Sequence, residues 1–233
     1  MILSKNNKIL VVAAHPDDEV LGCGGTVNRL AQEGSEIYLC VMGEGVTARY
    51  QNRKECDSQT ISKLHKTSKE ISKIQGYQDA FFFSLPDNRF DTIPLLEIIK
   101  KIELMIDQIK PDTIFTHHYG DLNIDHCITL KAVLTATRPL EDCSVKNVLT
   151  FEIPSSTEWN FNSSSNSVFQ PNIFVDIYKT IEHKIKALEL YTSEVKIFPH
   201  PRSPEAIKSI SKKWGSTVGL LSAEPFQLIR SVL

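Results

Sequence analysis

Three features that mark other protein classes are missing from this sequence of 233 residues. The five cysteines are scattered and never form a Cys-x-x-Cys pair, so neither a disulfide framework nor a thiolate zinc site follows from them. The longest apolar run near the start, residues 9–14, is too short for a signal-peptide core or a membrane span. Lys and Arg total 26 against 28 Asp and Glu, which is not the basic excess of a nucleic-acid-binding protein. We therefore expect a cytoplasmic protein with no stable membrane association and no nucleic-acid partner.

The sequence does contain a regular alternation of short apolar runs and amphipathic stretches. The runs predict strands at 8–14, 37–42, 80–83 and 113–116, and the stretches predict helices at 20–33, 60–74, 92–109 and 124–137. This alternation predicts an α/β fold with a Rossmann-like, mostly parallel sheet covered by helices.

The alternation weakens after about residue 150. A Ser/Asn-rich loop at 154–171 surrounds Trp159, and a strand at 173–177, a helix at 179–191 and a last helical stretch after Pro204 follow. We therefore expect one domain over residues 1–233, in which about 150–233 form a C-terminal cap and closing elements.

The segment Ala14-His15-Pro16-Asp17-Asp18-Glu19 follows the first predicted strand directly. One acid at this place is explained as a helix cap. Three acids and a histidine are more than a cap needs, and ligands of parallel sheets bind beyond the carboxyl ends of strands. The segment is therefore a candidate functional site.

A dinucleotide-binding module is the alternative interpretation of the same region. Gly22-Cys23-Gly24-Gly25 follows a strand, and Glu44 ends the second strand near where a ribose-binding acid stands. Against this, Val27 replaces the third glycine of the fingerprint, and the preceding acids would repel a pyrophosphate.

A second cluster, residues 116–126, follows another core strand and contains three histidines and two aspartates. His15, Asp18 and one of the later histidines would give two imidazoles and a carboxylate, which suits catalytic zinc with an open position or non-haem Fe(II). Asp17 is then free to take a proton from water, and Asp125 to orient a ligand histidine.

The AHPDDE sequence at 14–19, together with D-x-N-x-D-H at 121–126, resembles the PIG-L (LmbE-like) family of metal-dependent de-N-acetylases. Residues 43–47 (GEGVT), 85–89 (LPDNR), 200–204 (HPRSP) and 223–226 (AEPF) add weaker matches. The resemblance implies His15, Asp18 and His126 as metal ligands, Asp17 as general base and Asp125 as an acidic neighbour of His126.

The sequence departs from the family pattern at Asn123, where many members carry a histidine that stabilises the oxyanion or protonates the leaving amine. This departure leaves His118 and Asp17 as candidates for the general acid, with Asn123 as a hydrogen-bond donor. Candidate substrate contacts are Arg49, Asn88, Arg89 and Arg202.

The resemblance thus implies a zinc-dependent hydrolase, with Fe²⁺ or another divalent metal as the alternative cofactor. Its expected substrate is a small N-acetyl amino sugar, either a soluble conjugate or a nucleotide-linked sugar, deacetylated by metal-activated water with Asp17 as base. The alternatives are an Fe(II) oxygenase, or a sugar- or dinucleotide-binding module without turnover. A homo-oligomer is compatible with the sequence.

Overall fold

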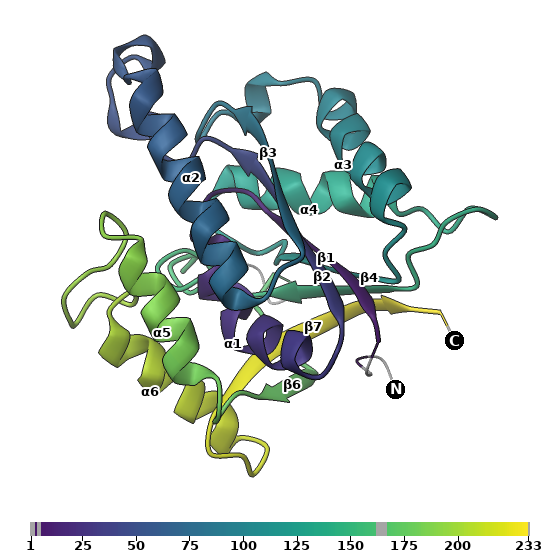
Figure 1. Cartoon of the computed structure of the whole chain (residues 1–233), viewed down its shortest axis with the longest axis vertical. Coiled ribbons are helices and arrows are strands. Elements are labelled where there is room, and N and C mark those ends of the chain that lie inside the picture. Colours follow the sequence, from purple (N-terminus) through teal and green to yellow (C-terminus); the bar gives the residue numbers. More distant parts are fainter. Residues whose placement is uncertain (1–2, 4–5, 162–166, 233) are drawn as a thin grey trace.

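Seven strands form one mixed sheet in the computed structural model, which describes residues 3, 6–161 and 167–232 (Figure 1). They are β1 (Lys8–Ala13), β2 (Glu36–Gly43), β3 (Asp79–Leu85), β4 (Thr113–His117), β5 (Asn147–Phe151), β6 (Ile173–Asp176) and β7 (Ala223–Ser231). Their order is β3-β2-β1-β4-β5-β7-β6. The strands from β3 to β5 are parallel, whereas β7 runs antiparallel to β5 and β6. The predicted α/β fold with a mostly parallel sheet is confirmed.

Helices cover both faces of this sheet (Figure 1). One face carries α1 (Asp18–Gln32), α2 (Ser58–Gln75), α5 (Ile181–Leu190) and α6 (Pro204–Ser216), and the other carries α3 (Leu95–Ile109) and α4 (Ile124–Ala136). Short 3₁₀ helices, Thr47–Arg49, Arg53–Glu55 and Phe90–Thr92, lie in the loops after β2 and β3. No helix in the described part of the chain is both long and apolar enough to cross a membrane.

The central strand β1 shows why its sequence is apolar throughout. Successive side chains point to opposite faces, so Ile9 and Val11 pack under α1, whereas Leu10 and Val12 pack under α3 and α4. Because both faces of a parallel sheet are covered, neither set is exposed to water.

The predicted helix at 92–109 begins three residues late, at Leu95. Pro94 is its N-terminal cap, and proline has no N–H to continue a helix from an earlier turn. The chain before it forms the 3₁₀ helix Phe90–Thr92 instead.

Two strands, β5 and β7, were not predicted from the sequence. The strand β5 has only five residues, and β7 mixes Pro225, Gln227 and Arg230 among its apolar residues. Pro225 is tolerated because this half of β7 pairs with β6 alone, and β5 pairs from Gln227 onward. Because β7 has different neighbouring strands along its length, its apolar and polar residues follow neither a regular alternation nor a continuous apolar run.

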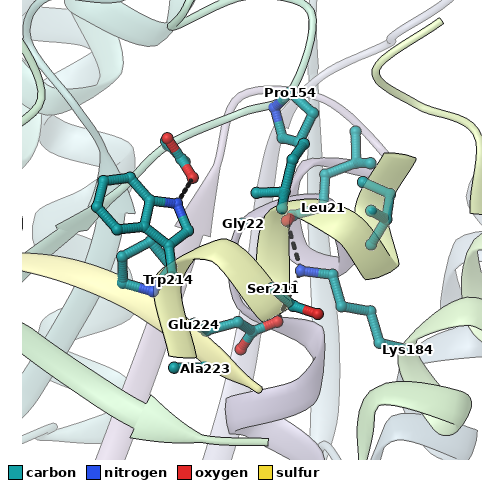
Figure 2. Close-up of a pocket in the computed structure, with 12 residues that line it drawn as sticks. Leu21, Gly22, Pro154, Lys184, Ser211, Trp214, Ala223 and Glu224 are labelled. Carbon is teal, nitrogen blue, oxygen red and sulfur yellow. Dashed lines mark hydrogen bonds and ion pairs between the residues drawn. The ribbon is translucent and has the colours of Figure 1, made fainter. Parts of the chain in front are cut away.

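The helix α1 is interrupted by one residue with non-helical dihedral angles, which frees main-chain groups. Glu224 Oε1 and Oε2 accept hydrogen bonds from the N–H groups of Gly25 and Thr26, at 2.9 and 2.6 Å. Lys184 Nζ donates to the carbonyl oxygen of Leu21 at 2.8 Å and to Glu224 at 2.7 Å (Figure 2). The buried ion pair thereby attaches the start of α1 to α5 and β7. The cavity beside it, about 20 Å³, has room for about one water molecule.

Candidate metal centre and catalytic cavity

The two histidine–acid clusters meet at the carboxyl edge of the sheet. The strands β1 and β4 are parallel neighbours, so the segments that follow them, residues 14–19 and 118–126, leave the sheet side by side. The loop after β3 reaches the same place, because the N–H of Asn88 donates to Asp125 Oδ2 at 2.6 Å.

His15, Asp18 and His126 bring three ligand atoms within 4.8 Å of one another. Asp18 Oδ2 lies 3.4 Å from His15 Nδ1 and 3.3 Å from His126 Nε2. All three side chains are buried. Two imidazoles and one carboxylate are the donor set of many catalytic zinc sites, so these residues fit a divalent ion.

Each of the two histidines presents its other ring nitrogen to a carboxylate. Asp125 Oδ2 lies 3.0 Å from His15 Nε2, and Asp121 Oδ1 lies 3.1 Å from His126 Nδ1. Such carboxylates fix the tautomer and ring orientation of metal-binding histidines. This arrangement directs the nitrogens next to Asp18 toward a common point, and it is the second reason that the site fits a metal.

The charges in this cluster shift its pKa values in opposite directions. Burial alone would lower the pKa of His126, but Asp18 and Asp121 outweigh it and raise the pKa to about 9. Burial would raise the pKa of Asp18, but His126 and His117 hold it well below its usual value. The site therefore carries an ionised carboxylate between imidazoles, which a bound cation would stabilise further.

Asp17 has an unusual backbone conformation for a residue with a side chain. Its φ is 106°, in the left-handed region, and its carboxylate does not cap α1 although it occupies the N-cap position. The carboxylate instead accepts a hydrogen bond from Arg202 Nη1 at 2.8 Å, and the main-chain N–H donates to Glu19 Oε2 at 3.0 Å. Burial raises the pKa of Asp17 well above its usual value despite Arg202. Strain of this kind persists where a site requires a particular orientation.

A chain of charges connects Asp17 to the loop after β2. Arg202 Nη1 lies 3.7 Å from Glu194 Oε2 as well as in contact with Asp17. Glu194 also forms an ion pair with Arg49. Two arginines and two acids thus alternate from the predicted base to the outer edge of the site.

A polar cavity of about 210 Å³ opens onto these groups. Among the predicted site residues, it is lined by His15, Asp17, Asp18, Arg49, Asn88, Asn123, His126 and Arg202. The side chain of Asn123 also caps α4, because its Oδ1 accepts a hydrogen bond from the N–H of Asp125 at 2.9 Å.

Three predicted residues are not among the described residues that line the cavity. Asp125 is buried behind His15. His118 is also buried, and its Nε2 faces the carbonyl oxygen of Ser167 at 3.1 Å. Arg89 is exposed at the end of the loop after β3.

Several residues of this site were given no individual role from the sequence. Asp87 Oδ1 lies 3.2 Å from His15 Nε2 and lines the cavity, and Glu194 lines it from the segment after α5. His117 is fully buried and accepts a hydrogen bond from the N–H of Ala14 at 2.8 Å. Asp87 and Asp121 belong to the quoted motifs LPDNR and D-x-N-x-D-H, which is a usable signal, whereas Glu194 stands in no motif.

The glycines at 22–25 pack against neighbouring elements. A Cβ on Gly22 would lie 2.3 Å from the ring of Phe151, and one on Gly25 would lie 3.0 Å from Ile177. Glu44 pairs with Arg53. These contacts account for the glycines by close packing of α1, without a bound dinucleotide.

Comparisons with known proteins give concordant results. Residues 10–137 match the family described as PIG-L: GlcNAc-PI de-N-acetylase. The "Uncharacterized deacetylase YaiS" of Escherichia coli K12 is 30% identical over 203 residues, which cover 82% of this chain and 96% of that protein. The "Probable N-acetyl-alpha-D-glucosaminyl L-malate deacetylase 2" of Bacillus cereus is 23% identical over 192 residues, or 80% and 83% of the two chains. The solved N,N'-diacetylchitobiose deacetylase of Pyrococcus horikoshii has a TM-score of 0.76 at 19% identity, over 96% and 84% of the chains. At that identity the structural match supports the fold alone.

Proposed function

The chain belongs to the PIG-L family, and from that premise we propose that it is a metal-dependent hydrolase that removes the acetyl group from an N-acetyl amino sugar. The observation that carries this proposal is the buried, strained Asp17 beside the His15–Asp18–His126 group in one polar cavity. A general base next to an open metal position is what amide hydrolysis by water requires.

His15, Asp18 and His126 would hold the metal, and we propose Zn²⁺ from this donor set, with Fe²⁺ as the alternative. When bound, a divalent ion lowers the pKa of water and polarises an amide carbonyl. Asp125 and Asp121 keep the two imidazoles oriented for this role.

Asp17 would act as the general base. Its raised pKa, caused first by burial, suits a group that takes a proton from the attacking water and later gives it to the leaving amine. Arg202 stabilises the ionised form and fixes the carboxylate in position. This assignment makes Asp17 the general acid as well, because His118 faces the main chain at Ser167.

Asn123 would assist the reaction from the cavity wall. Its Oδ1 is engaged in capping α4, so that its Nδ2 group remains available as a hydrogen-bond donor. An amide can stabilise an oxyanion in this way but cannot deliver a proton. We assign Asn123 as the residue that stabilises developing negative charge on the acetyl oxygen.

The rest of the substrate would contact polar residues around the cavity. Arg49, Asn88 and Arg202 line it, and Arg89 is exposed nearby. The relative from Bacillus cereus, by its printed name, acts on a glucosaminyl conjugate of malate, which supports a soluble conjugate as the substrate class. We also propose that residues 1–233 form a single domain, which is supported by the pairing of β6 and β7 with the sheet that holds the site.

The decisive test is acetate release by purified protein from a panel of N-acetyl amino-sugar glycosides and sugar nucleotides, with free amine as a second readout. The protein is measured as purified, after chelation, and after addition of Zn²⁺ or Fe²⁺. We expect activity that chelation abolishes and one metal restores. A protein that binds the same sugars but releases no acetate with either metal would be the non-catalytic binding module instead.

A further inference from the structure

A second cavity, of about 350 Å³, lies beside the catalytic cavity. It is formed by the loop after β2, by α2 and by the segment at the end of α5, and we call it the α2–α5 cavity. Arg49 lines both cavities. A ligand that extended from the metal site past Arg49 would therefore reach the α2–α5 cavity.

The lining of the α2–α5 cavity contains two cations, one of which, Arg49, is paired with Glu194 outside the lining. Its charged members are Arg49 and Lys63, and no Asp or Glu is among the described residues that line it. Lys63 is exposed on α2 and forms no ion pair with the described part of the chain. Leu64 and Leu190 provide apolar surface, and hydroxyl groups complete the wall. This combination suits an anionic group with a short carbon skeleton.

Alternating charged side chains connect the α2–α5 cavity to Asp17, the proposed general base. Arg49 is paired with Glu194, which in turn lies 3.7 Å from Arg202, the partner of Asp17. An anion that binds Arg49 would compete with Glu194 for its guanidinium group, and Glu194 also lies near Arg202. Occupation of the α2–α5 cavity is therefore coupled by contact to the side chain that holds the base.

We propose that the α2–α5 cavity binds the group attached to the amino sugar, and that this group carries a carboxylate or a phosphate. The inference rests on the proposed deacetylase function and names its substrate class. The acetamido group lies in the catalytic cavity, the sugar ring passes Arg49, and the anionic oxygens lie between Arg49 and Lys63. The volume is near the lower end of the ~300–1,000 Å³ range of small-molecule sites, so the attached group is small.

The test compares three N-acetylglucosaminides with the same alkyl spacer, ending in a methyl, a carboxylate or a phosphate group. We expect kcat/KM for at least one anionic glycoside to exceed that for the methyl glycoside by about tenfold, mainly through KM. The advantage should shrink as salt is raised from 0.05 to about 0.5 M, because the two cations are partly exposed. The anionic glycoside with the larger increase in kcat/KM shows whether the group bound in the cavity is a carboxylate or a phosphate.

Two lysine variants connect the selectivity to the cavity. Lys63→Ala should reduce the ratio of anionic to neutral kcat/KM severalfold, because it removes one of the two cations. Lys66→Ala removes a neighbouring exposed lysine of α2 that is not among the described lining residues, and it should leave the ratio unchanged. Equal kcat/KM for the three glycosides, or equal ratios in the two variants, would overturn the proposal.

Deacetylation and anion binding can be lost separately. If no glycoside is deacetylated, the proposed function is wrong, and equilibrium binding still decides about the cavity. Calorimetric titration of the wild-type protein and both lysine variants with the anionic glycosides measures Kd without turnover. A Kd that rises severalfold in Lys63→Ala but not in Lys66→Ala supports the anion site, whereas identical Kd values, or no binding, contradict it.

Discussion

The hydroxyl group of Tyr191, at the end of α5, donates a hydrogen bond to Glu19 Oε1 at 2.6 Å in the first turn of α1. The other oxygen of this carboxylate accepts the N–H of Asp17, and the tyrosine hydroxyl also contacts Ser68 Oγ at 2.8 Å. Burial raises the pKa of Glu19 to about 7, and the hydrogen bond from Tyr191 opposes that rise. The C-terminal part of the chain thus supports the left-handed conformation of Asp17 through one buried carboxylate.

Tyr191→Phe should therefore destabilise the protein. Removing the hydroxyl leaves a fully buried carboxylate without one of its donors, which typically costs about 1–3 kcal/mol of unfolding free energy. Urea unfolding followed by circular dichroism measures the change. Tyr38→Phe is the matched control, because its hydroxyl makes only an exposed contact of 3.4 Å with Glu36. Equal losses in the two variants would show that the Tyr191 hydroxyl contributes nothing specific.

Metal content tests the proposed ligands directly. We expect about one divalent ion per chain in the wild-type protein, and strongly reduced content in His15→Ala and in His126→Ala, because each removes one of the three proposed ligands. Mass spectrometry of the folded, desalted proteins gives the metal content. His183→Ala, which changes an exposed histidine on α5, should keep the wild-type amount. Full occupancy in both ligand variants would place the metal elsewhere.

Asp17→Asn should retain the metal and lose most of the turnover. The amide keeps the size of the side chain but cannot accept a proton from water, and loss of a general base typically reduces kcat by ~10²–10⁴-fold. Steady-state kinetics with the best glycoside, together with metal analysis of the same preparation, measures both properties. Near-native kcat in the metal-loaded variant would make Asp17 a structural residue.

The convergence of His15 and Asp18 with one of the later histidines could be predicted from the sequence because of one rule of topology, and the resemblance to the PIG-L family then pointed to His126. Both clusters follow buried strands, and the ends of neighbouring parallel strands share one edge. The role of Glu194 could not be predicted, because a single acid more than a hundred residues from Arg49 leaves no local pattern. The strand was predicted to end at residue 116, whereas β4 ends at His117, whose ring stacks on His126. The strands β5 and β7 were not predicted, because the first is short and the second pairs with different strands along its length. Neither has a clear alternation of apolar and polar residues.

His117 should make stability depend on pH. Burial, followed by the neighbouring His126, lowers the pKa of His117 to about 3, below its usual value of 6.5. Between these values the unfolded chain binds the proton and the folded chain does not. Protonation of His117 therefore has no effect on the unfolding free energy above about pH 6.5. As the pH falls from 6.5 toward 3, proton binding to the unfolded chain lowers the unfolding free energy by up to about 1.4 kcal/mol per pH unit.

His117→Gln isolates this effect, because its side-chain oxygen can still accept the N–H of Ala14. Unfolding free energies of both proteins are measured in urea between pH 4 and 8 with a chelator present. We expect the wild-type protein to lose more stability than the variant as the pH is lowered. Parallel pH profiles would mean that His117 takes up its proton equally in both states.

Asn123→Asp separates the two tasks of Asn123, the residue that departs from the family pattern. A carboxylate caps a helix about as well as an amide, so the variant should keep the wild-type unfolding free energy. It has no N–H to donate, and loss of one oxyanion donor typically reduces kcat by ~10²–10³-fold. Asn123→Ala should show the same loss of kcat and, in addition, a loss of about 1 kcal/mol of stability from the missing cap. His118→Ala should keep the pH profile of kcat, because its ring faces the main chain at Ser167 and we propose Asp17 as the group that moves the proton. If Asn123→Asp retains kcat and His118→Ala removes the alkaline limb, Asn123 is only a cap and His118 is the acid.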